Sequence, residues 1–331
     1  MSPSEQPVVP ASPLPRRSLG ATGLRVTPLC IGCAEIGDMV DTFAYSVPED
    51  RALETVRTAF ASPFNFLDTA ASYGDGESER RIGLVIREMG GLPDGAVLST
   101  KADRDLRSGD FSGEQFRRSV ERSLRLLGLE HLQIVFMHDP EHTTFEAAMA
   151  RGGPVDVLQR FKAEGVIDHV GVAGGPIDLL MRFVETGAFE AVITHNRYTL
   201  LNQSAAPLIE MAQRRGLGVL NAAPYGSGLL AKGPRTYPRY AYTEAPAELV
   251  RRAQAIADIC QEYGVPLAAA ALQFSLRDPR ITSTIVGMSR PERLTQTLEL
   301  ASLSLPDELW SRLEEHVGPP VDPETVRWRR A

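Results

Sequence analysis

Residues 113–137 read GEQFRRSVERSLRLLGLEHLQIVFM and combine one helical pattern with one strand pattern. Apolar side chains recur at the spacing of one helical face in the first part: Phe116, Val120, Leu124 and Leu127. This spacing predicts an amphipathic helix over residues 113–127. The run LQIVFM at residues 132–137 is short and apolar and contains β-branched residues, which is typical of a strand buried on both faces of a parallel sheet. The stretch therefore predicts a helix that leads into a buried parallel strand.

The same alternation continues along the rest of the chain. The runs that we expect to form strands cover residues 29–32, 64–67, 96–99, 132–137, 170–172, 191–193, 218–220 and 284–286. Further helical patterns cover residues 51–60, 77–89, 205–215 and 246–263. Eight buried strands that alternate with helices over roughly 300 residues match a (β/α)8 barrel. We therefore expect an α/β protein with one TIM-barrel domain.

A doubly wound open sheet is the competing architecture. Such folds carry a glycine-rich turn, G-x-G-x-x-G, after the first strand. Here the first strand leads into GCAEIG at residues 32–37, which does not match that pattern. The barrel is therefore favoured.

The chain is divided into a leader, a barrel and a tail. Residues 1–15 are rich in Pro and Ser and are interpreted as a flexible leader without the apolar core of a secretory signal. Residues 16–318 are assigned to the barrel domain. It begins with a small hairpin within residues 16–27, ahead of the first barrel strand, and ends with a helix within residues 303–317. Residues 319–331 are expected to be a polar tail. The polar stretch 232–247 is expected to be an extended loop on the barrel rim.

Composition restricts the class of partner. The 331 residues contain 35 Lys and Arg against 42 Asp and Glu, a formal charge of −7, which argues against a nucleic-acid partner. No apolar stretch approaches the ~20 residues of a membrane span. Three cysteines cannot form a disulfide framework, and the Cys30-x-x-Cys33 spacing is interpreted as core because no second pair exists to complete a zinc site. We expect a cytoplasmic protein, monomeric or homo-oligomeric, with no metal site.

Ionisable residues follow three consecutive predicted strands. Asp68, Lys101 and His138 each stand where a strand ends, and Tyr73 follows in the loop after Asp68. A barrel places its active site at this rim, so these side chains are expected to meet in one pocket. The ammonium of Lys101 would lower the pKa of the Tyr73 phenol, and Asp68 would hold Lys101 in place. A neutral His138 would donate a hydrogen bond to a substrate oxygen. The set predicts proton transfer, and redox chemistry would require a cofactor.

These residues stand in motifs that resemble the aldo-keto reductase family. The motifs are FLDTAASYG at residues 66–74, STK at 99–101 and MH at 137–138, and the resemblance covers residues 16–305. It implies that Asp68, Tyr73, Lys101 and His138 are a catalytic tetrad. It also implies an extended nicotinamide cofactor bound without a Rossmann domain.

The segment after the eighth predicted strand is expected to bind the cofactor phosphate. Ser289 and Glu292 have the spacing of a capping box at a helix start, and a helix N-terminus binds anions. Arg290 and Arg293 would clamp an adenosine 2′-phosphate, as the equivalent segment of the family does. NADP is therefore favoured, with NAD as the alternative, because Gln296 and Thr297 depart from the family pattern.

Other family positions are altered in this chain. Ala173-Gly174 stands where a Ser-Asn pair holds the nicotinamide amide, His195 replaces a Gln, and Ala222 replaces an aromatic stacking residue. The resemblance implies these cofactor contacts: Ala34, His195, Asn196, Ala223, Tyr225, Ser227, Gly228, Gly287, Ser289, Arg290 and Arg293. Glu35, Ile36 and Asp139 are expected to contact the substrate.

The segments at residues 196–201 (NRYTLL) and 221–224 (NAAP) resemble the branch of L-fucose, D-threo-aldose and L-galactose 1-dehydrogenases. That branch oxidises a sugar hemiacetal to a lactone. The resemblance therefore implies an aldose 1-dehydrogenase. The alternatives are a general aldehyde or ketone reductase and, from another class, a cofactor-binding regulatory barrel that senses redox state.

Overall fold

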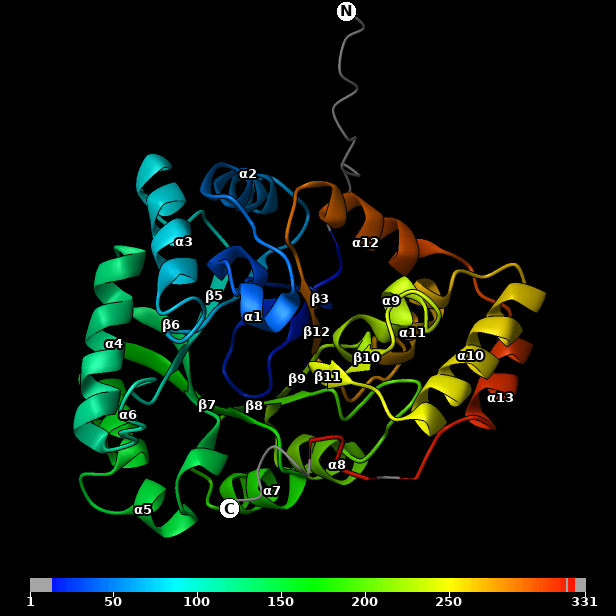
Figure 1. Cartoon of the computed structure of the whole chain (residues 1–331). Helices are drawn as coiled ribbons and strands as arrows, with labels where there is room; N and C mark the ends of the chain where they lie inside the picture. The colour runs from blue at the N-terminus through cyan, green and yellow to red at the C-terminus, as the bar shows by residue number, and fades with distance from the viewer. Residues whose placement is uncertain (1–13, 320, 325–331) are drawn as a thin grey trace, which may run out of the picture.

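The computed structural model describes residues 14–319 and 321–324. Eight parallel strands close a barrel in the order β12-β3-β4-β5-β6-β7-β8-β9. Their bounds are β3 Leu29–Gly32, β4 Phe66–Asp68, β5 Val97–Ala102, β6 Leu132–His138, β7 Ile167–Gly174, β8 Ala191–His195, β9 Gly218–Ala222 and β12 Ser283–Gly287. Helices surround the strands (Figure 1). The predicted (β/α)8 fold is confirmed.

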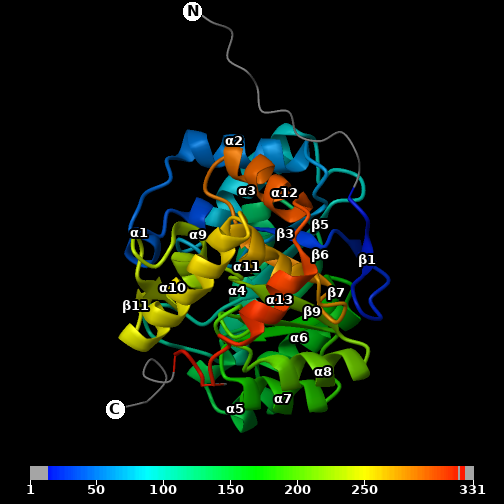
Figure 2. The ribbon, with the colours of Figure 1, turned by 90° about the vertical axis from the view of Figure 1, so that its right-hand side faces the viewer.

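The helices of the outer layer follow the strands in chain order. They are α2 Glu49–Phe60, α3 Glu77–Glu88, α4 Gly113–Leu127, α6 Pro154–Ala163, α7 Ile177–Glu185, α8 Ala206–Arg214, α10 Ala247–Glu262, α11 Leu267–Leu276, α12 Glu292–Ser302 and α13 Asp307–Glu314. Three short helices lie in loops: α1 Val40–Phe43, α5 Phe145–Met149 and α9 Leu229–Lys232. The C-terminal α13 packs against α10, and the two lie side by side in Figure 2.

Local sequence explains why α4 has the predicted bounds. The Ser112 side chain accepts a hydrogen bond from the backbone N–H of Gln115 and caps the first turn. Gly128 ends the helix with a φ of 70°, a left-handed conformation that glycine adopts without steric cost. Phe116 and Val120 are buried on the inner face.

The predicted N-terminal hairpin closes one end of the barrel. Strands β1 Arg17–Ser18 and β2 Arg25–Val26 pair in an antiparallel manner. Leu19 and Val26 are buried in the cluster that fills the barrel interior. A Cβ on Gly20 would lie 2.3 Å from the backbone nitrogen of Gly218, so only glycine permits this close approach. Because this end is sealed, the C-terminal ends of the strands form the open end.

The two cysteines of the C-x-x-C sequence lie in different layers. Cys30 belongs to the barrel interior, whereas Cys33 packs in the layer between strands and helices. Both thiols are free and buried, which confirms the core interpretation.

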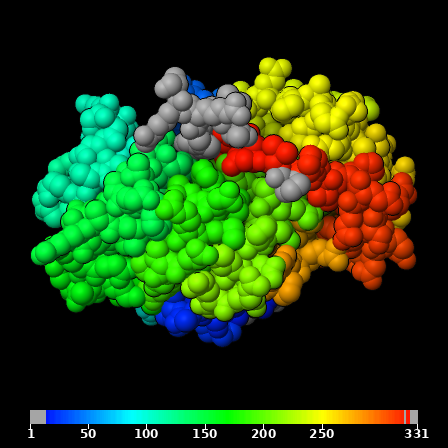
Figure 3. Space-filling model, turned by 90° about the horizontal axis from the view of Figure 1, so that it is seen from below, coloured from blue at the N-terminus to red at the C-terminus, as the bar shows by residue number. Residues whose placement is uncertain are grey.

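The rim loop contains regular structure, and residues 321–324 of the tail contact the barrel. The stretch 232–247 contains a two-stranded hairpin, β10 Arg239–Tyr240 and β11 Thr243–Glu244, and Tyr240 is buried against α9 and α10. The C-terminal segment lies along the surface of the barrel (Figure 3), where the Asn202 side chain donates a hydrogen bond to the Val321 carbonyl. Within the part of the chain that the structure describes, no helix is long and apolar enough to span a membrane.

Candidate active site

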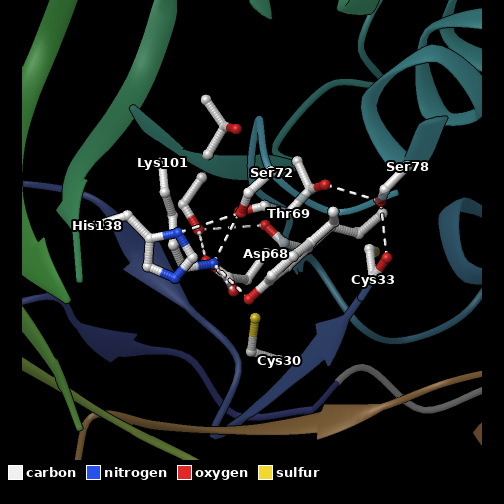
Figure 4. A network of polar contacts seen from close by, with 12 residues as sticks. Cys30, Cys33, Asp68, Thr69, Ser72, Ser78, Lys101 and His138 are labelled. Carbon is white, nitrogen blue, oxygen red and sulfur yellow. Dashed lines mark hydrogen bonds and ion pairs between the residues drawn. The ribbon is translucent and has the colours of Figure 1, made fainter. Parts of the chain in front are cut away.

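The polar side chains at the strand ends meet because neighbouring parallel strands end at the same rim. Asp68 is the last residue of β4 and pairs in register with Ser99 of β5, while Lys101 of β5 pairs with Phe136 of β6. His138 is the last residue of β6. Asp68, Lys101 and His138 therefore lie close together at this rim, as expected (Figure 4).

Lys101 is the centre of the cluster. Its ammonium donates to Asp68 at 2.6 Å, to the Thr69 carbonyl at 2.8 Å and to the Tyr73 hydroxyl at 3.2 Å. The second oxygen of Asp68 accepts from Ser99 at 2.7 Å. The Lys101 and Asp68 side chains are only 3% and 4% exposed. A buried charge pair is stable only when its remaining donors and acceptors are satisfied, and here they are.

Burial and the charge of Lys101 have opposite effects on the pKa of Tyr73. Desolvation raises the pKa of the Tyr73 phenol above its ordinary value, and the charge of Lys101 opposes this effect without overcoming it. Lys101 therefore lowers the pKa of Tyr73 as expected, but burial, which the sequence did not indicate, raises it by more. The pKa of Lys101 is raised, because the charges of Asp68 and Tyr73 outweigh its desolvation, so Lys101 stays an ammonium ion.

His138 has a partner that the sequence analysis missed. Its Nδ1 lies 2.7 Å from Oδ1 of Asp103, the residue directly after β5. The Tyr73 and His138 rings meet edge to face, with centroids 5.9 Å apart. The sequence did contain one indication of this contact, because Asp103 is the next ionisable residue after Lys101 at the end of the same strand.

A cleft with a volume of about 410 Å³ opens at this rim and extends from the tetrad to the start of α12. All four tetrad residues line it. So do most of the expected cofactor and substrate residues: Ala34, Glu35, Asp139, His195, Ala223, Tyr225, Ser227, Gly228, Gly287, Ser289 and Arg293. The cleft therefore brings strand ends and distant loops together in one space.

Three expected contact residues are not in the lining. Ile36 is 1% exposed and belongs to the core. Asn196 is fully buried, and its side-chain oxygen accepts a hydrogen bond from Ser227. Arg290 is exposed on the turn before α12, with its guanidinium 4.0 Å from Glu292. Of the two arginines expected to clamp a phosphate, only Arg293 lines the cleft.

The expected capping box is also wrong. Helix α12 begins at Glu292, its N-cap residue is Pro291, and no side chain caps it. Glu292 instead pairs with Arg51 of α2 at 2.5 Å. A long-range ion pair has replaced the local contact that the sequence pattern indicated.

His195 is held by the C-terminal tail. Its Nε2 lies 3.1 Å from Glu324, and the fully buried Arg197 contacts Glu324 at 2.7 Å and Asp322 at 2.6 Å. Burial raises the pKa of Glu324, but hydrogen bonds and charge from His195 and Arg197 outweigh it and lower the pKa to about 2. Nothing in the sequence pattern indicated that the tail reaches the cleft.

The lining chemistry suits a nicotinamide dinucleotide. Arg293, Lys232 and Ser289 provide a cation-rich end, which fits phosphate groups. A Cβ on Gly287 would lie 1.8 Å from a Glu35 oxygen, so this glycine makes room for the Glu35 carboxylate at that wall of the cleft. The opposite end carries the proton-transfer cluster. Phosphates at one end and a reacting ring at the other match such a cofactor.

Comparisons with known proteins agree with this geometry. The aldo/keto reductase family model matches residues 28–317. The chain is 34% identical to a D-threo-aldose 1-dehydrogenase from a Pseudomonas species (89% of this chain, 95% of the relative), 31% identical to a pyridoxal 4-dehydrogenase from Microbacterium luteolum (90% and 96%) and 30% identical to an L-galactose dehydrogenase from Arabidopsis thaliana (92% and 94%).

The fold has a match among solved structures. The holo form of an aldo-keto reductase from Bacillus halodurans superimposes with a TM-score of 0.76 at 21% identity, covering 95% of this chain and 99% of that one. The D-threo-aldose and L-galactose enzymes belong to the branch that the sequence resembles, so that resemblance is confirmed. The family match extends over nearly the whole barrel, and the chain belongs to the aldo/keto reductase family.

Proposed function

We propose that the protein is an aldose 1-dehydrogenase that oxidises the hemiacetal carbon of a sugar to a lactone and prefers NADP(H) to NAD(H). Aldo-keto reductases are oxidoreductases that use a nicotinamide cofactor. The observation that carries the proposal is Lys101, which bridges Asp68 and Tyr73 beside His138 inside a cleft with a cation-rich far end. The two sugar dehydrogenases among the relatives support the substrate class.

The proposed roles follow from the contacts. When bound, the cofactor supplies or accepts the hydride. Tyr73 exchanges a proton with the substrate oxygen, and the charge of Lys101 stabilises the phenolate during that exchange. Asp68 holds Lys101 charged and in position. His138 orients the substrate oxygen, and Arg293 contacts the cofactor phosphate.

The polar side of the cleft favours a substrate with several hydroxyl groups. Asp139 lies 3.6 Å from Nε2 of His138 and 3.9 Å from Arg104. Ser72 lines the same side. Carboxylate, guanidinium and hydroxyl groups around the reacting position can each hydrogen-bond a sugar hydroxyl.

Other lining residues favour the alternative, an aldehyde reductase for apolar or aromatic substrates. Met39, Phe43, Leu106 and Tyr242 also line the cleft. Leu106 is 48% exposed, although leucine is usually buried. One relative is named for pyridoxal, an aromatic aldehyde.

Steady-state rates in both directions distinguish these functions. The purified protein is assayed with L-fucose and NADP⁺ and with an aromatic aldehyde and NADPH. Oxidation of the sugar supports the proposal, whereas turnover confined to the aromatic aldehyde overturns it in favour of the reductase. A single slow turnover with tightly held cofactor and no substrate preference would instead identify a regulatory binding protein.

We also propose that the enzyme works in the cytoplasm, because its three cysteines are free thiols. Fractionation of the source cells tests this location, and recovery outside the cytoplasmic fraction contradicts it.

A further inference from the structure

Asp103 is a buried carboxylate whose role the proposed function does not use. It is 3% exposed and follows the end of β5. Its Oδ2 accepts a hydrogen bond from the backbone N–H of Ser72 at 3.0 Å, and its Oδ1 lies 2.7 Å from Nδ1 of His138. Its own backbone N–H donates to Ser119 and its carbonyl accepts from Gln115, both on α4. The carboxylate is therefore oriented by Ser72 and His138, and the backbone that carries it is fixed by α4.

This contact determines which nitrogen of His138 carries the proton. A carboxylate only accepts hydrogen bonds, so Nδ1 must carry a hydrogen. A neutral His138 then has a lone pair at Nε2, the nitrogen left for the cleft. In this tautomer a neutral His138 does not donate to the substrate, which differs from the expectation from the sequence. The ring can donate from Nε2 only as an imidazolium ion.

Charged groups from several elements set the balance between the two forms. Asp103 follows β5, Asp139 follows β6 and lies 3.6 Å from Nε2, and Lys101 lies on β5. The ring of Tyr73, from the loop after β4, meets the His138 ring edge to face. Arg104 offsets Asp139, and His195 of β8 faces the same carboxylate. Desolvation lowers the pKa of His138, but Asp103 and Asp139 outweigh it, and the net pKa is raised above 6.5.

We propose that Asp103 is a positioning residue that holds His138 in its Nδ1-protonated tautomer, so that Nε2 accepts a hydrogen bond from a substrate hydroxyl when the ring is neutral and donates one to a substrate carbonyl when the ring is charged. The pair thereby makes the binding of each of the two substrates depend on pH. The consequence for kinetics rests on the proposed function, whereas the tautomer itself does not.

The first test reads the tautomer directly and needs no substrate. The protein has six histidines, and ¹⁵N-histidine labelling resolves the two ring nitrogens of each. A His138→Gln spectrum identifies the signals of His138. We expect the neutral ring of the wild-type protein to be protonated at Nδ1. Protonation at Nε2 would overturn the proposal, even if the enzyme turned over every substrate offered.

The second test uses Asp103→Asn. The N–H of Ser72 needs an acceptor, so the amide oxygen faces Ser72 and the amide nitrogen faces His138. The amide then donates to Nδ1 and moves the ring proton to Nε2. We expect the neutral signals to invert to the Nε2 tautomer, and circular dichroism verifies that the variant is folded. Unchanged ring signals would contradict the inference.

Kinetics of the same variant separate a positioning role from a merely structural one. In the wild-type protein, KM for the carbonyl substrate, measured with the aromatic aldehyde and NADPH, should rise about tenfold from pH 6 to pH 9 as His138 loses the proton on Nε2. In Asp103→Asn this rise should disappear, and KM for the sugar at pH 9 should increase about tenfold.

Asp94→Asn is the matched control. It removes an exposed carboxylate just before the start of β5 and should keep the wild-type pH profile. A pH profile shared by all three proteins would refute the pH dependence. Absence of turnover by all three would count against the proposed function alone.

Discussion

The two ends of the cleft are built differently. At the tetrad end, Lys101 and Asp68 are buried on adjacent strands, and every donor of the ammonium has a partner within 3.2 Å. At the far end, Arg293 lies at the start of α12 and Lys232 at the end of the short α9, and Arg290 lies outside the lining on an exposed turn. Backbone pairing fixes the first end in place, whereas the second depends on loops whose course is set by distant packing. The comparison indicates that the chemistry is rigidly positioned and that cofactor preference depends on fewer contacts.

The largest expected effect is on the rate at the tetrad end. Replacing Tyr73 with Phe removes the group that exchanges the proton, so kcat/KM should fall about 10³-fold in both directions. Affinity for NADPH, measured by fluorescence titration, should stay within a factor of three of wild type, because the phenol is not part of the phosphate end. A kcat/KM within tenfold of wild type would show that another group performs the proton transfer.

A second variant tests the rigidity of that end. Lys101→Met leaves the carboxylate of Asp68 buried beside Ser99 alone, and breaking such a pair costs about 3–5 kcal/mol. Urea unfolding should show this loss of stability. The double variant Asp68→Leu/Lys101→Met removes the unpaired charge and should recover part of it. A single variant as stable as wild type would mean that the cluster does not support the fold.

The packing behind β5 gives a prediction about pH. Glu79 of α3 is fully buried against Thr100, and desolvation raises the pKa of Glu79 from 4.5 to about 7. Between these two values the folded protein binds more protons than the unfolded chain, so the free energy of unfolding decreases as pH rises through this range. In Glu79→Gln the free energy of unfolding should therefore decrease less over this range, by up to about 3 kcal/mol, than it does in the wild-type protein.

The measurement is urea unfolding of wild type and Glu79→Gln at pH 5 and pH 8. The variant should differ little at pH 5 and be the more stable protein at pH 8. Glu121→Gln, on an exposed position of α4, is the control for the loss of one carboxylate. Parallel pH dependence in wild type and Glu79→Gln would contradict the prediction.

The smallest effect is expected at the far end, where it separates two neighbouring arginines. Arg293→Ala should weaken NADPH binding about tenfold and leave NADH binding nearly unchanged, because it removes one charge-assisted contact to the extra phosphate. The side chain of Arg290 lies outside the cleft, so Arg290→Ala should change NADPH affinity by less than about threefold. Fluorescence titration of both cofactors measures the difference. Equal losses in the two variants would mean that Arg290 turns inward to bind the phosphate.

Sequence reasoning succeeded wherever backbone periodicity determined position. The eight strands, the bounds of α4 and the convergence of Asp68, Lys101 and His138 follow from apolar runs and from the rule that parallel strands end at one rim. Prediction from the sequence failed where a side chain contacts a residue far away in the chain instead of its sequence neighbour. Ser289 and Glu292 have the spacing of a capping box, but Glu292 pairs with Arg51 across two helices.

The amino-acid sequence by itself determined the family, the barrel and the residue types at the strand ends, because hydrophobic alternation and short motifs are local properties of the chain. Only the tertiary structure decided which groups surround those residues. Asp103 reaches His138 because Ser72 and α4 hold it there, and Glu324 reaches His195 although the two are far apart in the chain. Contacts of this kind depend on how loops and the tail pack onto the finished barrel, and the free energy of that packing is shared among many distant residues rather than contained in one segment.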